Sequence, residues 1–366
     1  MKILHAIRGL PVAAGTTTFV VEIANEMARH GHEVVVAVYC EPSPHDVGLF
    51  DGRVTVLSIA KVIAGGLKFD VVHLHALWSW DLHRVAVWAR RCGVRIVWSP
   101  HGMLTEWALS QGRMKKLFAW HLFQRRDLVR SACLHVTAPS EVEDVQRIGL
   151  RTSTVVIPLG VTPAMPVDEV LALKREAEKS SVRTLLFVSR IQKKKGLVNL
   201  IRAWADLKLR SKCTHGWRVR IVGPDSENHT AELRLLCGEL SCTEDFSFVG
   251  ELRGSALQNE YACADLFVLP TMSENFGSVV IESLACATPV ITTEGAPWQG
   301  LEDHQCGWWI KIGVESLVKT LEMAMSMSIG DRLAMGLRGR QWVESDFSWP
   351  KVVDQLLCKY SGLVQW

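Results

Sequence analysis

Short apolar runs rich in valine and isoleucine recur along the chain in two series, and this feature most restricts its fold. Seven runs fall at residues 2–7, 33–39, 54–59, 71–75, 95–99, 134–137 and 154–157, and five more at 184–189, 218–222, 246–249, 265–269 and 289–292. A turn and a helix-like segment follow each run. Apolar runs without polar alternation suit strands that are buried on both faces of a parallel sheet. We therefore predict an α/β fold with two Rossmann-like βαβ domains, whose parallel sheets face a central cleft.

A stretch at residues 158–182 separates the two series. It contains Pro158, Pro163 and Pro166 before a charged, helix-like run, and we interpret it as the linker. The N-terminal domain is expected over residues 1–162 and the C-terminal domain over residues 163–347. A chain of 366 residues agrees with two domains, because a single domain mostly holds about 100–200 residues.

Composition and missing motifs exclude several classes of protein. The chain is 48% hydrophobic and 22% charged, which is typical of globular proteins and not of disordered or fibrous ones. Ten cysteines without a C-x-x-C pair predict neither a zinc site nor a disulfide framework. Because no secretory signal or membrane span is predicted, we expect a cytoplasmic protein with reduced cysteines. G-x-G-x-x-G and P-loop motifs are missing, so the dehydrogenase and P-loop hypotheses lose their best support.

The connection at residues 189–196 carries basic side chains between a predicted strand and a helix. In open parallel sheets, ligands bind beyond the carboxyl ends of the strands. Arg190 and Lys195 place positive charge beside a helix N-terminus, which suits a diphosphate. Taken alone, this segment is better explained as a solvated lysine run before a helix.

The connection at residues 270–285 carries two carboxylates. Glu274 lies in the loop and Glu282 on the following helix, where the first N–H groups, near Ser278 and Val279, can receive a phosphate oxygen. The two carboxylates are too far apart to share one partner. One carboxylate on each side of a phosphate site suits a nucleotide sugar, in which a hexose, a diphosphate and a ribose follow one another.

The stretch from Glu274 to Glu282 is an E-x7-E motif, and residues 270–289 resemble glycosyltransferase family 4, whose members have the GT-B fold. Further segments fall in the register of that family, at residues 14–16, 99–102, 189–196, 248–250 and 261–265. The final helix, from Ser348 onward, resembles the family's segment that crosses back to the N-terminal domain. The resemblance therefore implies that residues 348–366 join that domain.

The resemblance implies a role for each matching residue around the diphosphate. Arg190 and Lys195 neutralise the leaving diphosphate, and the backbone N–H groups of Ser278 and Val279 assist them. Glu282 binds the ribose of the nucleotide. Taken alone, Glu282 is equally well explained as an exposed helix carboxylate.

The resemblance also assigns residues to the transferred sugar. Glu274 holds sugar hydroxyls, and His101 hydrogen-bonds the sugar near the reacting centre, so these two are the expected catalytic residues. The backbone beside Glu274 also contacts the sugar, at Asn275, Phe276 and Gly277. Gly15 lets the backbone approach the phosphate and the acceptor, although Ala14 stands where the family often has another glycine. Taken alone, His101 could be a core histidine and Gly15 a turn former.

No metal and no cofactor are expected. The chain contains no D-x-D triplet, and cationic side chains with a helix dipole can stabilise the leaving group instead. The nucleotide sugar is a co-substrate. The resemblance implies retention at the anomeric carbon, with the departing phosphate oxygen taking the acceptor proton.

Residues 111–130 indicate what kind of acceptor the protein uses. Six basic residues interleave there with apolar ones: Arg113, Lys115, Lys116, Arg125, Arg126 and Arg130 alternate with Met114, Leu117, Phe118, Trp120, Leu122 and Phe123. Such a helix can lie in an anionic membrane interface, and the alternative is a packed helix with a solvated basic face. No nucleic-acid motif accompanies the charge. Family members with similar Trp-Ser-Pro-His-Gly-Met and Ala-Pro-Trp segments resemble enzymes of surface-polysaccharide assembly.

These observations predict a retaining, metal-independent hexosyltransferase that uses a GDP- or UDP-sugar in cell-surface polysaccharide or lipopolysaccharide biosynthesis. A lipid-linked saccharide acceptor is favoured and a soluble sugar stays open. The expected location is the cytoplasm, with peripheral attachment to the inner face of the cytoplasmic membrane. Two other classes stay open, namely a GT-B-fold nucleotide-sugar epimerase, which the E-x7-E motif disfavours, and a non-catalytic sugar-nucleotide binding protein.

Overall fold

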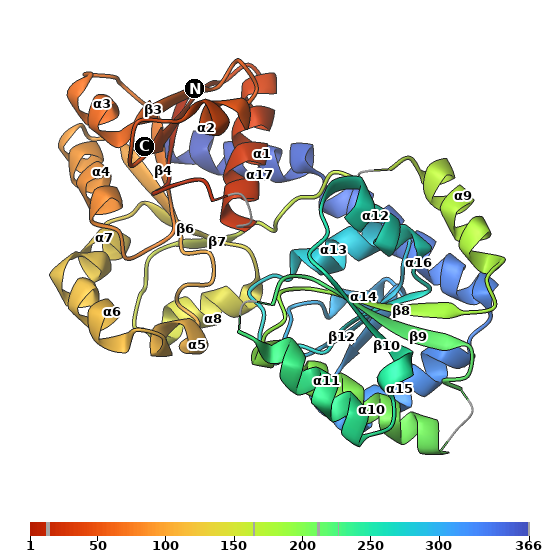
Figure 1. Cartoon of the computed structure of the whole chain (residues 1–366). Coiled ribbons are helices and arrows are strands. Elements are labelled where there is room, and N and C mark those ends of the chain that lie inside the picture. Colours follow the sequence, from red (N-terminus) through yellow and green to blue (C-terminus); the bar gives the residue numbers. More distant parts are fainter. Residues whose placement is uncertain (12–14, 164, 211–212, 226, 365–366) are drawn as a thin grey trace. The chain divides into compact units, whose positions relative to one another are not determined.

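A computed structural model describes residues 1–11, 15–163, 165–210, 213–225 and 227–364. The chain forms two compact units (Figure 1). The N-terminal unit comprises Met1–Gly160 together with the chain from Trp349 onward, and the C-terminal unit comprises Val161–Ser348. No helix in the described ranges is long and apolar enough to cross a membrane.

The N-terminal unit is built on a sheet of seven parallel strands in the order β3-β2-β1-β4-β5-β6-β7. The strands are β1 (Lys2–Ala6), β2 (Glu33–Val38), β3 (Thr55–Ser58), β4 (Val71–His75), β5 (Arg95–Ser99), β6 (Cys133–Val136) and β7 (Thr154–Val156). The helical segments are α1 (Gly15–Arg29), α2 (Pro44–Gly48), α3 (Ile59–Ala64), α4 (Trp80–Arg91), α5 (Glu106–Ser110), α6 (Arg113–Ala119), the π-helical η1 (Trp120–Gln124), α7 (Arg125–Val129), α8 (Pro139–Arg147) and α17 (Trp349–Val364).

The C-terminal unit is built on six parallel strands in the order β10-β9-β8-β11-β12-β13. The strands are β8 (Arg183–Val188), β9 (Trp217–Val222), β10 (Phe246–Gly250), β11 (Leu266–Leu269), β12 (Val290–Thr293) and β13 (Gly307–Ile310). The helical segments are α9 (Val167–Glu178), η2 (Lys193–Lys195), α10 (Leu197–Arg210), α11 (His229–Glu239), η3 (Thr243–Asp245), α12 (Gly254–Cys263), α13 (Ser278–Ala285), α14 (Gly300–Asp303), α15 (Val314–Ser326) and α16 (Ile329–Asp346).

The α/β class and the two Rossmann-like sheets are confirmed, and every predicted apolar run contributes to a strand. Strand β13 was not predicted from the sequence. Its sequence, Gly-Trp-Trp-Ile, has no valine run, and it pairs with β12 as an edge strand.

Both faces of the N-terminal sheet are buried, which explains why its strands lack polar alternation. Ile3 and Val34 are paired in the sheet and contribute to the core formed with α1 and α17. Their neighbours Leu4 and Val35 contribute to the core on the other face, formed with α3 and α4. Successive strand residues therefore point to opposite, equally apolar layers.

The last helix belongs to the N-terminal unit. Figure 1 shows α17, in blue, beside α1, in red, and both contribute to the same core. A Cβ atom at Gly160 would lie 2.4 Å from the Trp349 ring, so only glycine allows the chain to pass this close to the start of α17. The boundaries of the two units, after Gly160 and Ser348, fall within two residues of the predicted ones.

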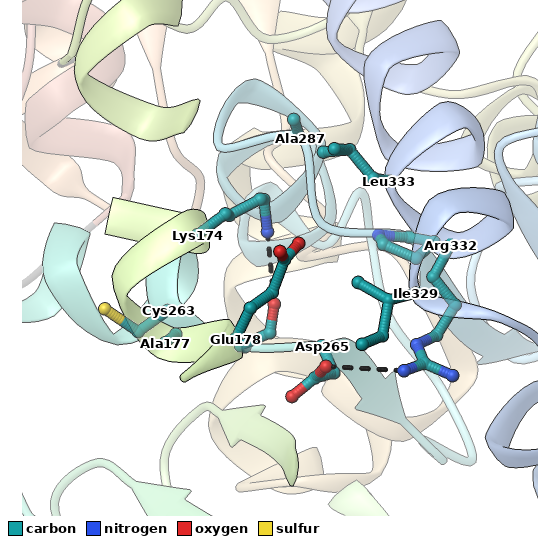
Figure 2. A pocket seen from close by; sticks show the side chains of 11 residues that line it. Lys174, Ala177, Glu178, Cys263, Asp265, Ala287, Ile329, Arg332 and Leu333 are labelled. Carbon is teal, nitrogen blue, oxygen red and sulfur yellow. Dashed lines mark hydrogen bonds and ion pairs between the residues drawn. The ribbon is translucent and has the colours of Figure 1, made fainter. Parts of the chain in front are cut away.

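The predicted linker at residues 158–182 is mostly part of the C-terminal unit, because that unit begins at Val161. Its helix α9 is held to the sheet by Lys174, whose Nζ atom donates to the Ala264 carbonyl at 3.1 Å and to Thr288 Oγ1 at 2.9 Å. Figure 2 shows Lys174 of α9 near Asp265, which accepts a bond from Arg332 of α16. The pocket between these side chains has a volume of only about 30 Å³ and lies where β11 begins. It is too small for a nucleotide, so these residues serve to hold α9 in place. Burial lowers the pKa of Lys174 to about 8.

Candidate active site

The loops that follow β8 and β11 touch each other, because these two strands are neighbours in the C-terminal sheet. The backbone N–H of Met272 donates to the Lys194 carbonyl at 2.8 Å. Gly196 has a φ of +75°, and a Cβ atom there would lie 1.9 Å from the Pro270 carbonyl oxygen. Only glycine permits this approach, so the two predicted site segments are fixed side by side.

Lys195 and Glu274 form an ion pair across these two loops. Their side chains are only 6% and 12% exposed, so little water screens the pair. The Glu274 backbone N–H also donates to the Gly295 carbonyl at 2.7 Å, which holds the loop in place. The structure thus brings together the cation expected at the diphosphate and the carboxylate expected at the sugar. Burial and the neighbouring Lys195 lower the pKa of Lys194, a residue that the sequence analysis did not select.

Arg190 lies just beyond β8, where it is exposed and makes no ion pair with a described residue. A second glycine supports this turn. Gly223 has a φ of +144°, and a Cβ atom there would lie 1.9 Å from the Ser189 carbonyl oxygen. Gly223 was not predicted as a site residue, although a glycine directly after the β9 run is a usable sequence signal.

The N-terminus of α13 lies beside the Glu274 loop. Gly277 is the N-cap residue of the helix, with a φ of +80°, and it has no side chain that could bond to the first-turn N–H groups. Trp298 Nε1 donates to the Phe276 carbonyl at 2.5 Å, and the two rings pack edge to face. The N–H groups at Ser278 and Val279 are therefore held where an anion can accept from them.

Glu282 is separate from the Lys195–Glu274 pair. It accepts a hydrogen bond from Tyr261 Oη at 3.0 Å and bonds to Ser278, and burial raises its pKa. It lines a cavity of about 220 Å³ between α12 and α13, together with Val161, Thr162, Gly254, Leu257, Gln258, Tyr261, Ala285 and Cys286. The explanation of Glu282 as an exposed carboxylate is therefore wrong.

In the N-terminal unit, His101 follows β5 in a left-handed turn with a φ of +51°. The next N–H, of Gly102, donates to Glu141 Oε2 at 2.8 Å. Glu141 is buried, and its other oxygen accepts from the backbone and hydroxyl of Thr137 at 2.8 and 2.6 Å. Glu141 thus fixes the turn that carries His101. The sequence analysis missed it, because an acid in the first turn of a helix is common for other reasons.

His101 ends a row of three hydrogen-bonded imidazoles, which we call the histidine row (His101, His75 and His5). His101 Nε2 lies 3.2 Å from His75 Nδ1, and His75 Nε2 lies 3.0 Å from His5 Nδ1. At the inner end, His5 Nε2 lies 3.4 Å from the sulfur of Met27. Burial lowers the pKa of His101 and of His5 to about 3, and it lowers the pKa of His75 well below its usual value, so the row is neutral at pH 7.

The proton positions in the histidine row follow from its inner end. A neutral imidazole has one N–H and one lone pair. If His5 Nε2 carried the lone pair, it would face the lone pairs of the Met27 sulfur, so Nε2 carries the proton. Each imidazole then donates inward through Nε2. His101 is left with a lone pair on Nδ1, which accepts a hydrogen bond and does not donate one.

A second chain of bonds, the Tyr360 network (Tyr360, His73, Ser99 and His135), crosses the same sheet. The Ile157 carbonyl can only accept, so His135 Nε2, at 2.9 Å, carries a proton. Ser99 Oγ therefore donates to His135 Nδ1 at 2.7 Å and accepts from His73 Nε2 at 2.6 Å. His73 Nδ1 then accepts from Tyr360 Oη at 2.5 Å. This network ties α17 to the sheet.

One group in the described part of the chain has the spacing of a metal site. Nitrogen atoms of His5, His73 and His75 lie within 4.8 Å of one another. The bonds of the histidine row and the Tyr360 network already occupy these nitrogens, and both nitrogens of His73 are used. A metal ion could bind these three histidines only by displacing those hydrogen bonds. The geometry therefore fits three neutral, hydrogen-bonded imidazoles better than it fits a metal site.

Gly15 is the first residue of α1, and Ala14 lies outside the described residues. A Cβ atom at Gly15 would meet no atom within 4 Å. The surrounding described residues would therefore tolerate a larger side chain at position 15. Only a bound ligand could make glycine necessary there.

Residues 113–129 form a basic surface made of α6, η1 and α7. Met114, Phe118 and Leu122 lie four residues apart and are 77%, 70% and 55% exposed. The six cations of residues 111–130 form no ion pair with a described carboxylate. The one acid, Asp127, is buried and pairs with Arg90 and His83. This surface therefore exposes cations and apolar side chains without an acid.

Comparisons with known proteins identify the family and the fold. The profile of "Glycosyl transferases group 1" matches residues 172–342, and that of "Glycosyl transferase 4-like domain" matches residues 14–160. D-inositol 3-phosphate glycosyltransferase of Acidothermus cellulolyticus is 29% identical over 341 residues, which cover 82% of this chain and 75% of the relative. Anabaena HepE in complex with UDP has a TM-score of 0.78 at 16% identity, over 99% of this chain and all of that one. WaaG, a glycosyltransferase involved in lipopolysaccharide biosynthesis, has a TM-score of 0.72 at 18% identity, over 96% and 98% of the two chains.

The first profile lies within the C-terminal unit and the second within the N-terminal unit. Each profile covers the loops of its unit that carry candidate residues. The fold is that of the GT-B enzymes. The chain is therefore a glycosyltransferase and belongs to family 4 of these enzymes.

Proposed function

We propose that the enzyme transfers a hexose from a nucleoside-diphosphate sugar to a saccharide acceptor, with retention of configuration and without a metal ion. The observation that carries this proposal is the buried Lys195–Glu274 pair beside the N-terminus of α13. It combines a cation for a diphosphate with a carboxylate for sugar hydroxyls, at the strand ends where ligands of parallel sheets bind.

In the proposed reaction, the bond between the anomeric carbon and the diphosphate oxygen breaks, and the electron pair stays on that oxygen. Lys195, Arg190 and the N–H groups of Ser278 and Val279 stabilise the growing negative charge. The acceptor oxygen forms the new bond on the same face. Its proton passes to the departing phosphate oxygen, so no protein base is needed.

Glu274 has two tasks in this proposal. It holds the Lys195 ammonium at the strand ends, and it accepts hydrogen bonds from sugar hydroxyls through its remaining lone pairs. His101 contributes an acceptor, because the histidine row leaves its Nδ1 unprotonated. Its low pKa excludes it as a proton donor at pH 7. The backbone at residues 275–277 completes the proposed donor site of the C-terminal unit. Gly15, in the N-terminal unit, is proposed to let the backbone approach the phosphate of the bound donor.

The nucleoside is proposed to lie at the cavity beside Glu282, whose carboxylate would bind the ribose hydroxyls. A uridine donor is the first to test, since the neighbour HepE was solved with UDP. A GDP-sugar is the second.

Two acceptors have support. The basic surface favours a lipid-linked saccharide at an anionic leaflet, in surface-polysaccharide or lipopolysaccharide assembly, with the enzyme held peripherally on the cytoplasmic side. The names of the relatives favour a soluble phosphorylated cyclitol such as inositol 3-phosphate.

The experiment is ligand-induced thermal stabilisation with UDP-, GDP-, ADP- and TDP-sugars, followed by transfer assays with the donor that binds. A donor at 100 times its Kd stabilises the fold by about 2.7 kcal/mol. Transfer to either acceptor class supports the proposal. Conversion of the donor sugar without any acceptor would indicate an epimerase, and binding without transfer or hydrolysis would contradict catalysis.

A further inference from the structure

A second cavity, of about 220 Å³, lies in the N-terminal unit beneath the basic surface. Its apolar lining comes from Trp78, Leu109, Leu117, Trp120 and Ile148. A cavity of this size with few polar groups favours an apolar ligand.

Two cations complete the lining, Arg113 and Lys116 of α6. Arg113 is exposed and pairs with no described carboxylate. Lys116 lies 6.0 Å from the centre of the Trp78 ring and donates to the Ala108 carbonyl at 2.5 Å. Since no acid lines the cavity, the two side chains suit an anion with an apolar part.

The backbone around this cavity is unusual in two places. Trp78 adopts a left-handed φ of +65°, and its N–H donates to Gln124 Oε1 at 2.8 Å. Trp120 and Gln124 are the ends of the π-helix η1, a rare geometry that is frequent at functional sites. The Nε1 donor of Trp78 and the buried Nε2 donor of Gln124 have no partner among the described residues. Buried donors without partners are costly and uncommon.

We propose that this cavity binds the hydrocarbon chain of an anionic amphiphile, with its phosphate between Arg113 and Lys116. The helical segments α6 and η1, which supply part of the lining, also expose the apolar residues Met114, Phe118 and Leu122, as a surface that meets hydrocarbon chains would. A free sugar phosphate would leave the apolar lining unused. Only the source of the amphiphile depends on the proposed function. That source is either a bilayer lipid or the lipid part of the acceptor.

The test is calorimetric titration of the full chain with dihexanoyl phosphatidylglycerol below its micellar concentration. Dihexanoyl phosphatidylcholine has the same chains without net charge, and glycerol phosphate has the charge without chains. We expect the phosphatidylglycerol to bind about tenfold more tightly than the phosphatidylcholine, because the net-neutral phosphatidylcholine gains less from charge-assisted contacts with the two cations. Glycerol phosphate should show no saturable binding. Equal affinity for glycerol phosphate and the lipid would overturn the proposal.

Matched variants locate the site. Arg113→Gln should weaken binding of the short-chain phosphatidylglycerol about tenfold. Lys115→Gln removes a neighbouring cation that does not line the cavity, and should change the affinity less than about twofold. Ile148→Trp fills the cavity and should abolish binding. Equal losses in the Arg113 and Lys115 variants, or wild-type affinity in the Ile148 variant, would assign binding to diffuse surface charge instead.

The source is distinguished by competition. If the short-chain lipid raises the KM for an alkyl-phosphate-linked saccharide, the cavity serves the acceptor, and if that KM is unchanged it serves a bilayer lipid. Donor titration of the same protein is independent of this cavity. A protein that binds the lipid but no nucleotide sugar would therefore refute the proposed function and leave this site standing.

Discussion

The Lys195 ammonium and the Glu274 carboxylate are each other's main charge partner, in a position that water hardly reaches. Neither charge would be tolerable there alone, because an unpaired buried charge is strongly destabilising. The pair therefore couples stability to chemistry: each residue proposed to act on the substrate also keeps the other ionised and in place.

This coupling predicts a specific pattern in a double-mutant cycle. Lys195→Met and Glu274→Gln should each lower kcat/KM at least about tenfold, from a lost charge-assisted contact worth about 1.5–3 kcal/mol. Each should also lower the free energy of unfolding, by up to about 3–5 kcal/mol. The double variant should recover much of that stability and none of the activity. Lys193→Met, at a side chain that is 71% exposed, is the control.

Denaturant unfolding and steady-state kinetics on the wild type, the two single variants, the double variant and the Lys193 control measure both effects. Additive losses of stability would show that the two charges do not compensate each other. Wild-type kinetics in the Lys195 variant would move the diphosphate site to Arg190 and Lys194.

Chelation tests the metal-independent mechanism. Transfer should be unchanged after dialysis against excess EDTA, because the described cations and the α13 N-terminus supply the positive charge at the leaving group. Loss of activity that Mg²⁺ or Mn²⁺ restores would refute this. A metal analysis of the purified protein also checks the histidine trio, for which we expect no stoichiometric ion.

The buried imidazoles predict how the N-terminal unit responds to acid. His5, His73, His75 and His135 are fully buried, and burial lowers the pKa of each below the usual 6.5. The unfolded chain therefore binds protons below pH 6.5 that the folded chain does not bind. Stability is complete above pH 6.5 and falls as the pH decreases, by about 1.4 kcal/mol per histidine and pH unit.

At pH 5.5 these four groups together should lower the free energy of unfolding by on the order of 5 kcal/mol. Urea midpoints at pH 7.5, 6.5 and 5.5 measure the slope. His73→Gln should reduce the slope by about one proton, and His45→Gln, at an exposed histidine, is the matched control. A midpoint that is flat from pH 7.5 to 5.5 would mean that the imidazoles are not buried as neutral groups.

The Tyr360 network predicts how much the Tyr360 hydroxyl contributes to the free energy of unfolding. Tyr360→Phe keeps the ring buried but leaves His73 Nδ1 without its donor. An unsatisfied buried acceptor costs about 1–3 kcal/mol, so the midpoint of unfolding should fall. Tyr39→Phe, at an exposed tyrosine, is the matched control and should change stability by less than about 0.5 kcal/mol. Equal midpoints for the two variants would exclude the bond.

The sequence predicted most of the fold because apolar runs report burial on both faces of a sheet directly. It predicted which loops carry Lys195 and Glu274, but their contact depends on β8 and β11 being neighbours in the sheet, and strand order is not local information. The networks around His101 were missed for the same reason. His5, His73 and His135 are ordinary strand residues until the sheet aligns them, and Glu141 reaches Gly102 from another helix.

The basic surface predicts binding to anionic membranes that weakens with salt. Within α6, η1 and α7 the cations have no described acidic partner, and Asp127 is turned inward, so the outward charge is larger than the sequence sum suggests. Near an anionic leaflet each cation contributes on the order of 1 kcal/mol, and the exposed Phe118 and Leu122 add an apolar term. The charge term is screened over about 10 Å at 0.1 M salt.

Co-sedimentation with vesicles of phosphatidylglycerol and of phosphatidylcholine, at low and high salt, checks this. Phe118→Ser should reduce the bound fraction on anionic vesicles several-fold. Leu209→Ser, at an 87% exposed leucine of α10 in the other unit, should not. If the wild-type protein pellets equally with both lipids at low salt, the basic surface is a solvated helix face. The soluble phosphorylated cyclitol then becomes the better-supported acceptor, because no charge would hold the enzyme beside a lipid-linked one.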